Sequence, residues 1–309
     1  MLKRFGPYTV ELKNLDKVMY PESGFTKDDV IGYYQKVGNL MTPWLSDRVL
    51  TMQRFPDGIG KQGFFQKNFP DHFPSWFTHR TVEVSDGKQQ VPVCNNLASL
   101  VYIANQGSIT QHVWLSRLSR IHHPDQMIFD LDPPDDDFEV VRRAALDCLE
   151  VLDALSLPAG VKTTGSRGLH IVTPLRRQEH FDTVREFARD CARLMVARHP
   201  DRYTLEQRID RRDGKLYLDV QRNAYGQTAV APYSLRARED APVATPIPRR
   251  ALDNPDLHSR SYTLESIHRY LAQSGNPWQD LRRRSCGLTP ARKKLDRMLS
   301  DAGACRDAG

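Results

Sequence analysis

Apolar residues recur along this chain with two spacings that separate helices from strands. A spacing of three and four residues predicts helices over 96–105, 140–155 and 181–198. Another helix should begin after Thr26, because Thr26 and Asp29 have the spacing of an approximate capping box. We expect this helix to end before Pro43, since proline interrupts helical hydrogen bonding.

Short apolar runs bounded by turn residues predict the strands. They lie at 48–54, 111–115, 127–132, 169–172 and 216–220, with a hairpin whose arms are 82–84 and 91–93. Strands and helices alternate through the middle of the chain, which favours an α/β or α+β fold. No linker-like stretch precedes residue 280 or so. We therefore expect one catalytic unit with two lobes over 1–290, then a basic and finally flexible tail over 291–309.

Composition narrows the class of protein. The 309 residues include 44 Lys+Arg and 38 Asp+Glu, a formal net charge of +6. With a pI near 9.1 and clustered arginines, the chain fits a nucleic-acid binder, although a solvated basic surface is the alternative. No apolar run approaches the roughly 20 residues that span a bilayer, so no membrane partner is expected. The five scattered cysteines, none in a CxxC pair, predict a cytoplasmic protein with incidental thiols.

The Asp130-Leu131-Asp132 run is the first candidate for chemistry. Residues i and i+2 of a strand leave on the same face, about 6.6 Å apart along it. Two carboxylates at ~4 Å repel by about 4 kcal/mol at an effective dielectric near 20, and a cation between them removes that cost. Asp219 lies in another apolar strand and is a third candidate ligand for Mg²⁺ or Mn²⁺. A polar strand end facing water is the other interpretation.

Groups that suit phosphate binding follow these carboxylates. The loop from Thr164 to Gly168, with His170 behind it, offers backbone N–H groups, hydroxyls, a guanidinium and an imidazole. It matches neither a Walker loop nor the GxGxxG pattern. Arg222 and Arg236, in the irregular stretch after Asp219, could neutralise phosphate charge, or could simply be exposed arginines.

Taken together, these motifs resemble the polymerase domain of bacterial ligase D, within the archaeo-eukaryotic primase superfamily. The resemblance rests on Phe129–Pro133, Thr164–Leu175 and Leu218–Arg238, supported by Arg54–Gly58, Phe64–Lys67 and His112–Trp114. It covers roughly residues 8–280 and implies a primase-type fold with mixed or antiparallel central sheets flanked by helices. It also implies a template-directed nucleotidyltransferase that fills gaps and extends ends in non-homologous end joining.

The resemblance assigns a role to each candidate residue. Asp130, Asp132 and Asp219 would hold two divalent cations, Mn²⁺ or Mg²⁺, as the catalytic centre. An NTP or dNTP, with ribonucleotides preferred, would be held by Thr164, Ser166, Arg167, His170, Arg222, Arg236 and His112. DNA with gaps or 5′-phosphorylated ends would be held by Lys17, Lys27, Arg54, Phe64, Phe65 and Lys67, with stacking on the phenylalanines.

The resemblance further implies a bacterial, nucleoid-associated protein and, as partners, Ku and a DNA ligase domain. Two residues depart from the family pattern: Arg167 stands where lysine is common, and Thr164 where serine is common. Arg211-Arg212-Asp213-Gly214 lacks the nucleophilic lysine of a ligase motif, so we expect no nick sealing. Three rival functions stay open at this point: a non-catalytic DNA-end binding or bridging module, a primer-independent primase, and a transferase acting on a sugar nucleotide.

Overall fold

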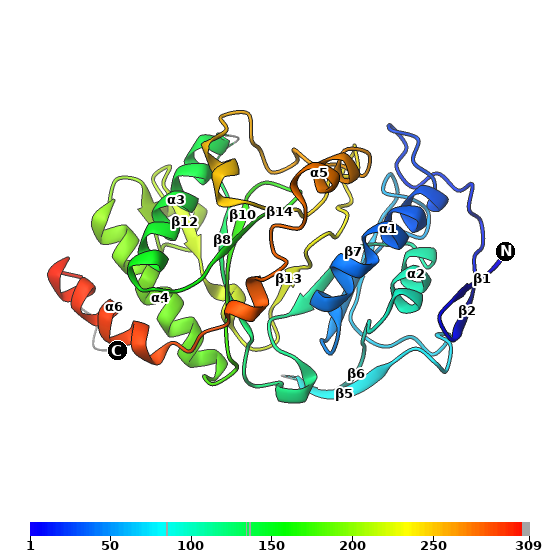
Figure 1. Ribbon diagram of the computed structural model, residues 1–309, viewed down its shortest axis with the longest axis horizontal. Coiled ribbons are helices and arrows are strands. Elements are labelled where there is room, and N and C mark those ends of the chain that lie inside the picture. The colour runs from blue at the N-terminus through cyan, green and yellow to red at the C-terminus, as the bar shows by residue number, and fades with distance from the viewer. Residues whose placement is uncertain (85, 134, 136, 305–309) are drawn as a thin grey trace. The chain divides into compact units, whose positions relative to one another are not determined.

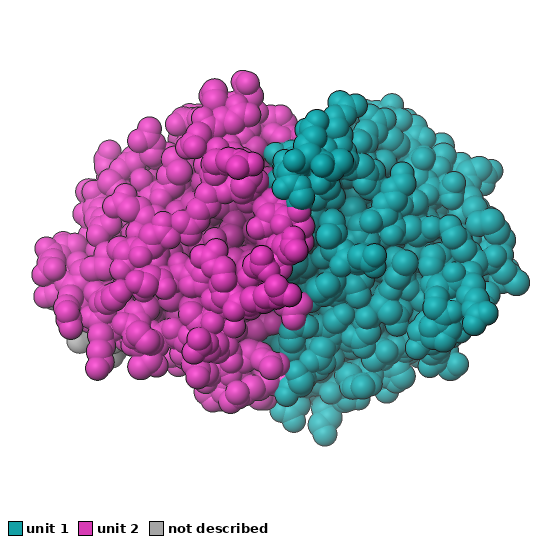
Figure 2. Space-filling model, in the orientation of Figure 1, with its two compact units in different colours: residues 1–119, 228–245, 262–275 teal, residues 120–227, 246–261, 276–309 magenta. Residues whose placement is uncertain are grey.

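The computed structural model describes residues 1–84, 86–133, 135 and 137–304. Its chain divides into two units, each assembled from three separate segments (Figure 2). Unit 1 consists of residues 1–119, 228–245 and 262–275, and unit 2 of residues 120–227, 246–261 and those from 276 onward. Because the chain passes repeatedly from one unit to the other, no single linker separates them. This explains why the sequence shows no linker composition at a domain boundary.

Unit 1 is built around a four-stranded antiparallel sheet in the order β13-β7-β3-β4. Helices α1 and α2 pack against each other, and α2 also contacts β7 (Figure 1). Two hairpins, β1-β2 and β5-β6, complete the strands. The bounds in this unit are β1 Leu2–Phe5, β2 Tyr8–Glu11, α1 Lys27–Leu45, β3 Leu50–Arg54, β4 Phe64–Gln66, β5 His79–Val84, β6 Gly87–Pro92, α2 Leu97–Asn105, β7 Ser108–Trp114, β13 Thr228–Val230 and α5 Ile267–Ser274.

Helix α1 begins where the sequence predicts and ends later. The Thr26 hydroxyl accepts from the Asp29 N–H at 3.3 Å, and the Asp29 carboxylate accepts from the Thr26 N–H at 2.8 Å, so the capping box is complete. The predicted end before Pro43 is wrong, because the helix continues to Leu45. Trp44 and Leu45 are buried there, and their packing outweighs the hydrogen bond that proline cannot make.

Replacing Thr26 by alanine is expected to lower the free energy of unfolding by about 1 kcal/mol, because the Asp29 N–H of the first turn loses its acceptor, the Thr26 hydroxyl. The shift of the urea midpoint at unchanged slope measures it. Thr26→Ser keeps the hydroxyl and is expected to stay within a few tenths of a kcal/mol of the native protein. Equal losses for both variants would contradict the role of the cap.

Unit 2 holds a six-stranded sheet in the order β11-β12-β8-β10-β9-β14. The β11-β12 pair is parallel and the other pairs are antiparallel. Helices α3 and α4 contact each other and the sheet, and α6 packs on α4 (Figure 1). The bounds are β8 Gln126–Leu131, α3 Phe138–Ala154, β9 Gly160–Thr163, β10 Leu169–Pro174, α4 Phe181–Arg198, β11 Tyr203–Thr204, β12 Leu216–Asp219, β14 Pro246–Ile247 and α6 Thr289–Asp301, with short 3₁₀ helices η1 Leu118–Arg120, η2 Ile209–Arg211, η3 Gln221–Asn223, η4 Arg249–Asp253 and η5 Leu281–Arg284.

Strand β10 lies between two strands that run parallel to each other. Both β8 and β9 pair with β10 in the antiparallel sense, so the connection from β8 through α3 to β9 crosses over one strand position. The crossover over 140–155 that the sequence predicts is present, with β10 inserted in the gap. The expectation of a mixed α/β fold with antiparallel sheets flanked by helices is confirmed.

The C-terminal segment differs from the tail that the sequence predicts. The boundary placed at residue 290 falls inside α6, whose Ala291, Leu295 and Leu299 are buried. Arg292 donates to the fully buried Asp190 of α4 at 2.7 Å, which ties the basic stretch to the unit. Residues 305–309 of the predicted flexible end lie outside the described residues, as does Pro134 after β8. Among the helices described, none is long and apolar enough to cross a bilayer.

Candidate active site

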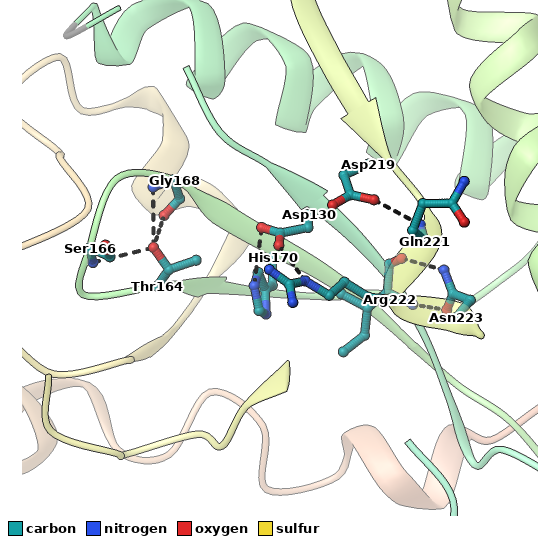
Figure 3. A network of polar contacts seen from close by, with 10 residues as sticks. Asp130, Thr164, Ser166, Gly168, His170, Asp219, Gln221, Arg222 and Asn223 are labelled. Atoms are coloured by element: carbon teal, nitrogen blue, oxygen red, sulfur yellow. Dashed lines mark hydrogen bonds and ion pairs between the residues drawn. The ribbon is translucent and has the colours of Figure 1, made fainter. Parts of the chain in front are cut away.

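Four polar residues form a row across four neighbouring strands of unit 2. Strand pairing sets Asp219 of β12 opposite Asp130 of β8, Asp130 opposite His170 of β10, and His170 opposite Lys162 of β9. Directly paired residues have their side chains on the same face of a sheet. Two carboxylates, an imidazole and an ammonium group therefore share one face (Figure 3 shows the first three).

The neighbouring row explains why these residues fold this way. Leu218, Leu131 and Leu169 pair with one another across the same three strands and are at most 1% exposed. Since side chains alternate along a strand, the leucines belong to the opposite face. Burial of the apolar row therefore fixes the register that brings Asp219 and Asp130 side by side.

Asp130 is buried, and its carboxylate contacts one imidazole and one guanidinium group. His170 Nε2 lies 3.2 Å from Asp130 Oδ1, and Arg222 Nε lies 3.0 Å from Asp130 Oδ2 (Figure 3). Burial alone would raise the pKa of Asp130, but His170 and Arg222 hold that pKa well below its usual range. Burial and the charge of Lys162 lower the pKa of His170 to about 4, so its ring is neutral at pH 7. Its Nδ1 is buried and accepts no hydrogen bond from the described residues.

The pKa values of the other two carboxyl groups, Asp132 and Asp219, shift upward instead. The Asp132 side chain reaches solvent, yet desolvation by the protein around it and the charge of Asp130 raise its pKa to about 6. Desolvation and Asp130 also raise the pKa of Asp219, against the hydrogen bond that its Oδ1 accepts from the Gln221 N–H at 2.8 Å. The cluster therefore carries excess negative charge, which a bound cation would stabilise.

Helix η3 begins two residues after Asp219 and carries Arg222. The next residue, Asn223, is fully buried and reaches β8 through its side chain. Its Oδ1 accepts from the Ile128 N–H at 2.9 Å, and its Nδ2 donates to the Ile128 carbonyl at 2.7 Å and to the Val220 carbonyl at 3.0 Å. The segment that bears Arg222 is thus attached to the strand that bears Asp130.

The loop between β9 and β10 is closed by Thr164. Its Oγ1 accepts from the Gly168 N–H at 3.1 Å and from the Ser166 N–H at 3.3 Å, and donates to the Gly168 carbonyl at 3.0 Å (Figure 3). A Cβ on Gly168 would clash with the Leu131 carbonyl and lie 2.6 Å from Asp132 Oδ1. Glycine is therefore required here by the close approach of the loop to the end of β8.

Arg167 lies over the loop that follows Asp132. Its Nη2 donates to the carbonyls of Pro133 at 3.2 Å and Asp135 at 3.3 Å. Ser166 is fixed from the other side, because its carbonyl accepts from Ser259 Oγ at 2.9 Å. The predicted phosphate-binding loop and the carboxylates thus lie next to each other in unit 2.

These residues fit divalent cations by their chemistry. Carboxylate oxygens are the ligands that Mg²⁺ and Mn²⁺ prefer, and two like charges directly opposite on adjacent strands need compensation. Within 1–84, 86–133, 135 and 137–304, no three His, Cys, Asp or Glu side chains are arranged to enclose an ion. Arg222 and His170 engage the two oxygens of Asp130. An ion bound at Asp130 would compete with Arg222 for Oδ2 and with His170 for Oδ1.

The remaining predicted residues belong to unit 1. Lys17 donates from Nζ to Asp57 Oδ1 at 2.9 Å, and Lys27, which is 6% exposed, donates to the Lys13 carbonyl at 3.2 Å. Burial and the charge of Lys17 lower the pKa of Lys27, so an anion bound beside both lysines would be stabilised.

Two exposed phenylalanines lie on β4, an edge strand of unit 1. Phe64 is 45% and Phe65 57% exposed. The buried Arg54 guanidinium lies 5.4 Å from the Phe64 ring centre, and the Phe65 ring meets His112 edge-on at 5.9 Å. Two adjacent exposed aromatics on a strand edge are available for stacking on a planar partner. The exposed Lys67 follows this strand. Arg236, elsewhere in unit 1, accepts a hydrogen bond through its backbone carbonyl from the Tyr20 hydroxyl at 3.0 Å.

Comparison with protein-family models decides the family. The model of the LigD primase-polymerase domain matches residues 26–278. The chain belongs to this family. A solved structure, the polymerase domain from Mycobacterium tuberculosis ligase D in complex with DNA, has a TM-score of 0.84 to this chain at 28% identity, covering 90% of this chain and 99% of that one. The primase-type fold inferred from the sequence motifs is thereby confirmed.

Two proteins similar to this chain are named for non-homologous end joining. The bifunctional non-homologous end joining protein LigD of Bacillus subtilis is 29% identical over 276 residues, 89% of this chain and 44% of that protein. The multifunctional non-homologous end joining protein LigD of Mycolicibacterium smegmatis is 31% identical over 251 residues, 80% of this chain and 33% of that protein. The chain thus spans less than half the length of both relatives.

The sequence motifs did not single out Lys162 or assign a role to Asn223. Lys162 is 1% exposed and belongs to the polar row. A lysine inside the apolar run before Thr164 is the signal that could have pointed to it, because lysine is rarely buried without a partner. Asn223 gave no such signal, because its partners lie on a strand far away in the sequence.

Proposed function

We propose that this chain is a template-directed nucleotidyltransferase that fills gaps and extends ends at DNA double-strand breaks. The pairing of Asp219 with Asp130, in a chain of the LigD primase-polymerase family, is the observation that carries the proposal. It puts two of the three predicted acids together on one face of the sheet, beside the predicted phosphate-binding loop. The names of the relatives supply the context of non-homologous end joining.

Asp130, Asp132 and Asp219 would hold two divalent cations, Mn²⁺ or Mg²⁺. When bound, such ions polarise a phosphoryl oxygen and lower the pKa of an attacking hydroxyl. The protein itself gathers the three carboxylates and supplies Arg222. The Arg222 guanidinium can leave Asp130 and bind an incoming phosphate instead. His170, neutral at pH 7, donates to Asp130 and keeps that carboxylate ionised.

The affinity for Mn²⁺ is expected to fall as the pH drops below about 6, by about tenfold per pH unit, because the ion competes with one proton on Asp132. The pKa of Asp132 is higher in the folded protein than in the unfolded chain, so protonation of Asp132 stabilises the metal-free fold. This contribution is full below the pKa of the unfolded chain and is lost as the pH rises through about 6. The rise in melting temperature on adding Mn²⁺ at pH 7 and at pH 5 measures the first effect. Equal rises at both values would contradict it.

The triphosphate of an incoming NTP or dNTP would be bound by the residues that the resemblance assigns to it. In unit 2 these are Thr164, Ser166, Arg167, His170 and Arg222, and in unit 1 they are Arg236 and His112. The contacts of the loop with the end of β8, beside the carboxylates, support the first part of this set. We include a preference for ribonucleotides in the proposal, on the resemblance alone.

The DNA substrate would be held by unit 1. Lys17 and Lys27 would grip a 5′-phosphate, and Phe64 and Phe65 would stack on bases, with Arg54 and Lys67 beside them. The lowered pKa of Lys27 and the exposure of both rings support this assignment. Ku and a ligase domain in the bacterial nucleoid are the proposed partners.

Extension of a gapped duplex tests the proposal. We expect addition of a templated nucleotide in the presence of Mn²⁺ or Mg²⁺, with stronger addition when the downstream strand carries a 5′-phosphate. Comparing NTP with dNTP, and a primed with an unprimed template, tests sugar preference and primer-independent synthesis. No metal-dependent addition under any of these conditions would contradict the proposal.

A non-catalytic DNA-end binding module is the second candidate. The ion pair between Arg222 and Asp130 favours it, because that contact neutralises the carboxylate without a metal. It predicts binding that depends on a 5′-phosphate and no nucleotide addition, so the same experiment separates the two functions.

A further inference from the structure

At the end of strand β12, a side chain makes the hydrogen bonds to β8 that the strand backbone would otherwise make. β12 pairs with β8 at Leu218 with Leu131 and at Asp219 with Asp130, and the chain then turns into η3. Continued antiparallel pairing would set Gln221 opposite Ile128, exchanging an N–H···O bond in each direction. The Asn223 amide makes both of these bonds with Ile128, at 2.9 and 2.7 Å.

This replacement frees the backbone of η3 to approach the carboxylates. The Gln221 N–H donates to Asp219 Oδ1 at 2.8 Å instead of to β8. Arg222 is therefore flanked by two anchored residues, and its Nε reaches Asp130 Oδ2 at 3.0 Å (Figure 3). A third hydrogen bond, from Asn223 Nδ2 to the Val220 carbonyl at 3.0 Å, closes the turn.

We propose that Asn223 is a positioning residue: its amide takes the place of the absent strand residue opposite Ile128 and holds Arg222 at the carboxylate cluster. The inference rests on the proposed function, in which Arg222 binds the triphosphate. Asn223 is fully buried, so it acts on nucleotide binding through Arg222 and contacts no substrate itself.

The amide is chemically specific for this position. It must accept from one N–H group and donate to two carbonyls at once, and neutral asparagine does all three. Asn223→Ala leaves these backbone groups without partners. Asn223→Asp keeps the volume and the acceptor but places an oxygen against two carbonyl oxygens, so both variants should release η3.

Unit 1 offers a matched control. Asn105 is also buried and also binds a backbone segment through its amide, accepting from the Lys13 N–H at 3.1 Å and donating to the Glu11 carbonyl at 3.0 Å. Asn105→Ala removes an equivalent amide with no contact to the carboxylate cluster. It should lower the melting temperature comparably and leave the affinity for Mn²⁺–ATP unchanged.

The test is a double-mutant cycle on the equilibrium affinity for Mn²⁺–ATP, which stays measurable without turnover. We expect Asn223→Ala to weaken binding by about tenfold or more in the native background and by less than about twofold in the Arg222→Ala background. Asn223→Asp takes its place in the cycle if the alanine variant does not fold.

The possible results separate the positioning role of Asn223 from the proposed function. Equal losses in both backgrounds, or the same loss with Asn105→Ala, would overturn the positioning role while leaving the proposed function intact. A native protein that neither binds Mn²⁺–ATP nor extends a primer would overturn the proposed function and this inference with it.

Discussion

Replacing Asp130 by alanine is expected to abolish nucleotide addition, with a fall of about 10³-fold or more, because the carboxylate central to the polar row is lost. DNA binding is expected to survive, because the proposed DNA-binding residues belong to unit 1. Single-turnover primer extension measures the first effect, and electrophoretic mobility of a gapped duplex measures the second. Asp130→Asn, which keeps the shape and removes the charge, is expected to be as inactive as Asp130→Ala.

Asp153→Ala serves as the control for the loss of a carboxylate in unit 2. Asp153 is exposed on α3 and pairs with Arg249 at 2.7 Å. Surface pairs of this kind contribute little, about 0–1 kcal/mol, so activity should stay near that of the native protein. Primer extension retained by Asp130→Ala would exclude Asp130 from the catalytic centre, whereas absence of extension by the native protein would favour the end-binding module.

Substitution of Gly168 by alanine is expected to lower the free energy of unfolding by about 3 kcal/mol and to reduce nucleotide addition more than tenfold. The added Cβ would clash with a backbone carbonyl, that of Leu131, which cannot rotate away as a side chain does. The loop must therefore shift away from β8, which separates it from Asp132. Urea unfolding and primer extension on the same preparation measure the two effects.

Gly32→Ala is the matched control for this substitution. Gly32 lies within α1, and a Cβ there meets no atom within 4 Å. Alanine is the better helix former, so this variant is expected to gain about 0.4–1 kcal/mol. A Gly168→Ala protein as stable as Gly32→Ala would show that the loop does not need its close approach to Leu131.

Local patterns were enough for most of the fold. The helix over 181–198 agrees with α4, and Asn96 caps α2 where the sequence predicts its start. Errors arose where tertiary packing outweighs a local rule, as at Pro43, whose helix continues because Trp44 is buried. The arrangement in two units was also beyond local patterns, since each unit gathers distant segments.

The candidate site could be predicted as a set of residue types but not as a geometry. Asp130 and Asp219 stood out as acids in apolar strands, yet nothing local states that β12 lies beside β8. That adjacency depends on register, which the buried leucines fix only once the strands meet. The hydrogen bonds of Asn223 to Ile128 join residues 95 positions apart, so no spacing rule could reveal them.

Insertion of β10 between β8 and β9 has a consequence for how the carboxylate cluster is assembled. The middle strand is made after both of its flanking strands, and β12 comes later still along the chain. The carboxylates therefore meet only after long loops have closed, which makes their assembly a slow, late event during synthesis. A nascent chain released before residue 223 would lack the Asn223 anchor, and unit 1 would also be incomplete, because its residues 228–245 and 262–275 follow.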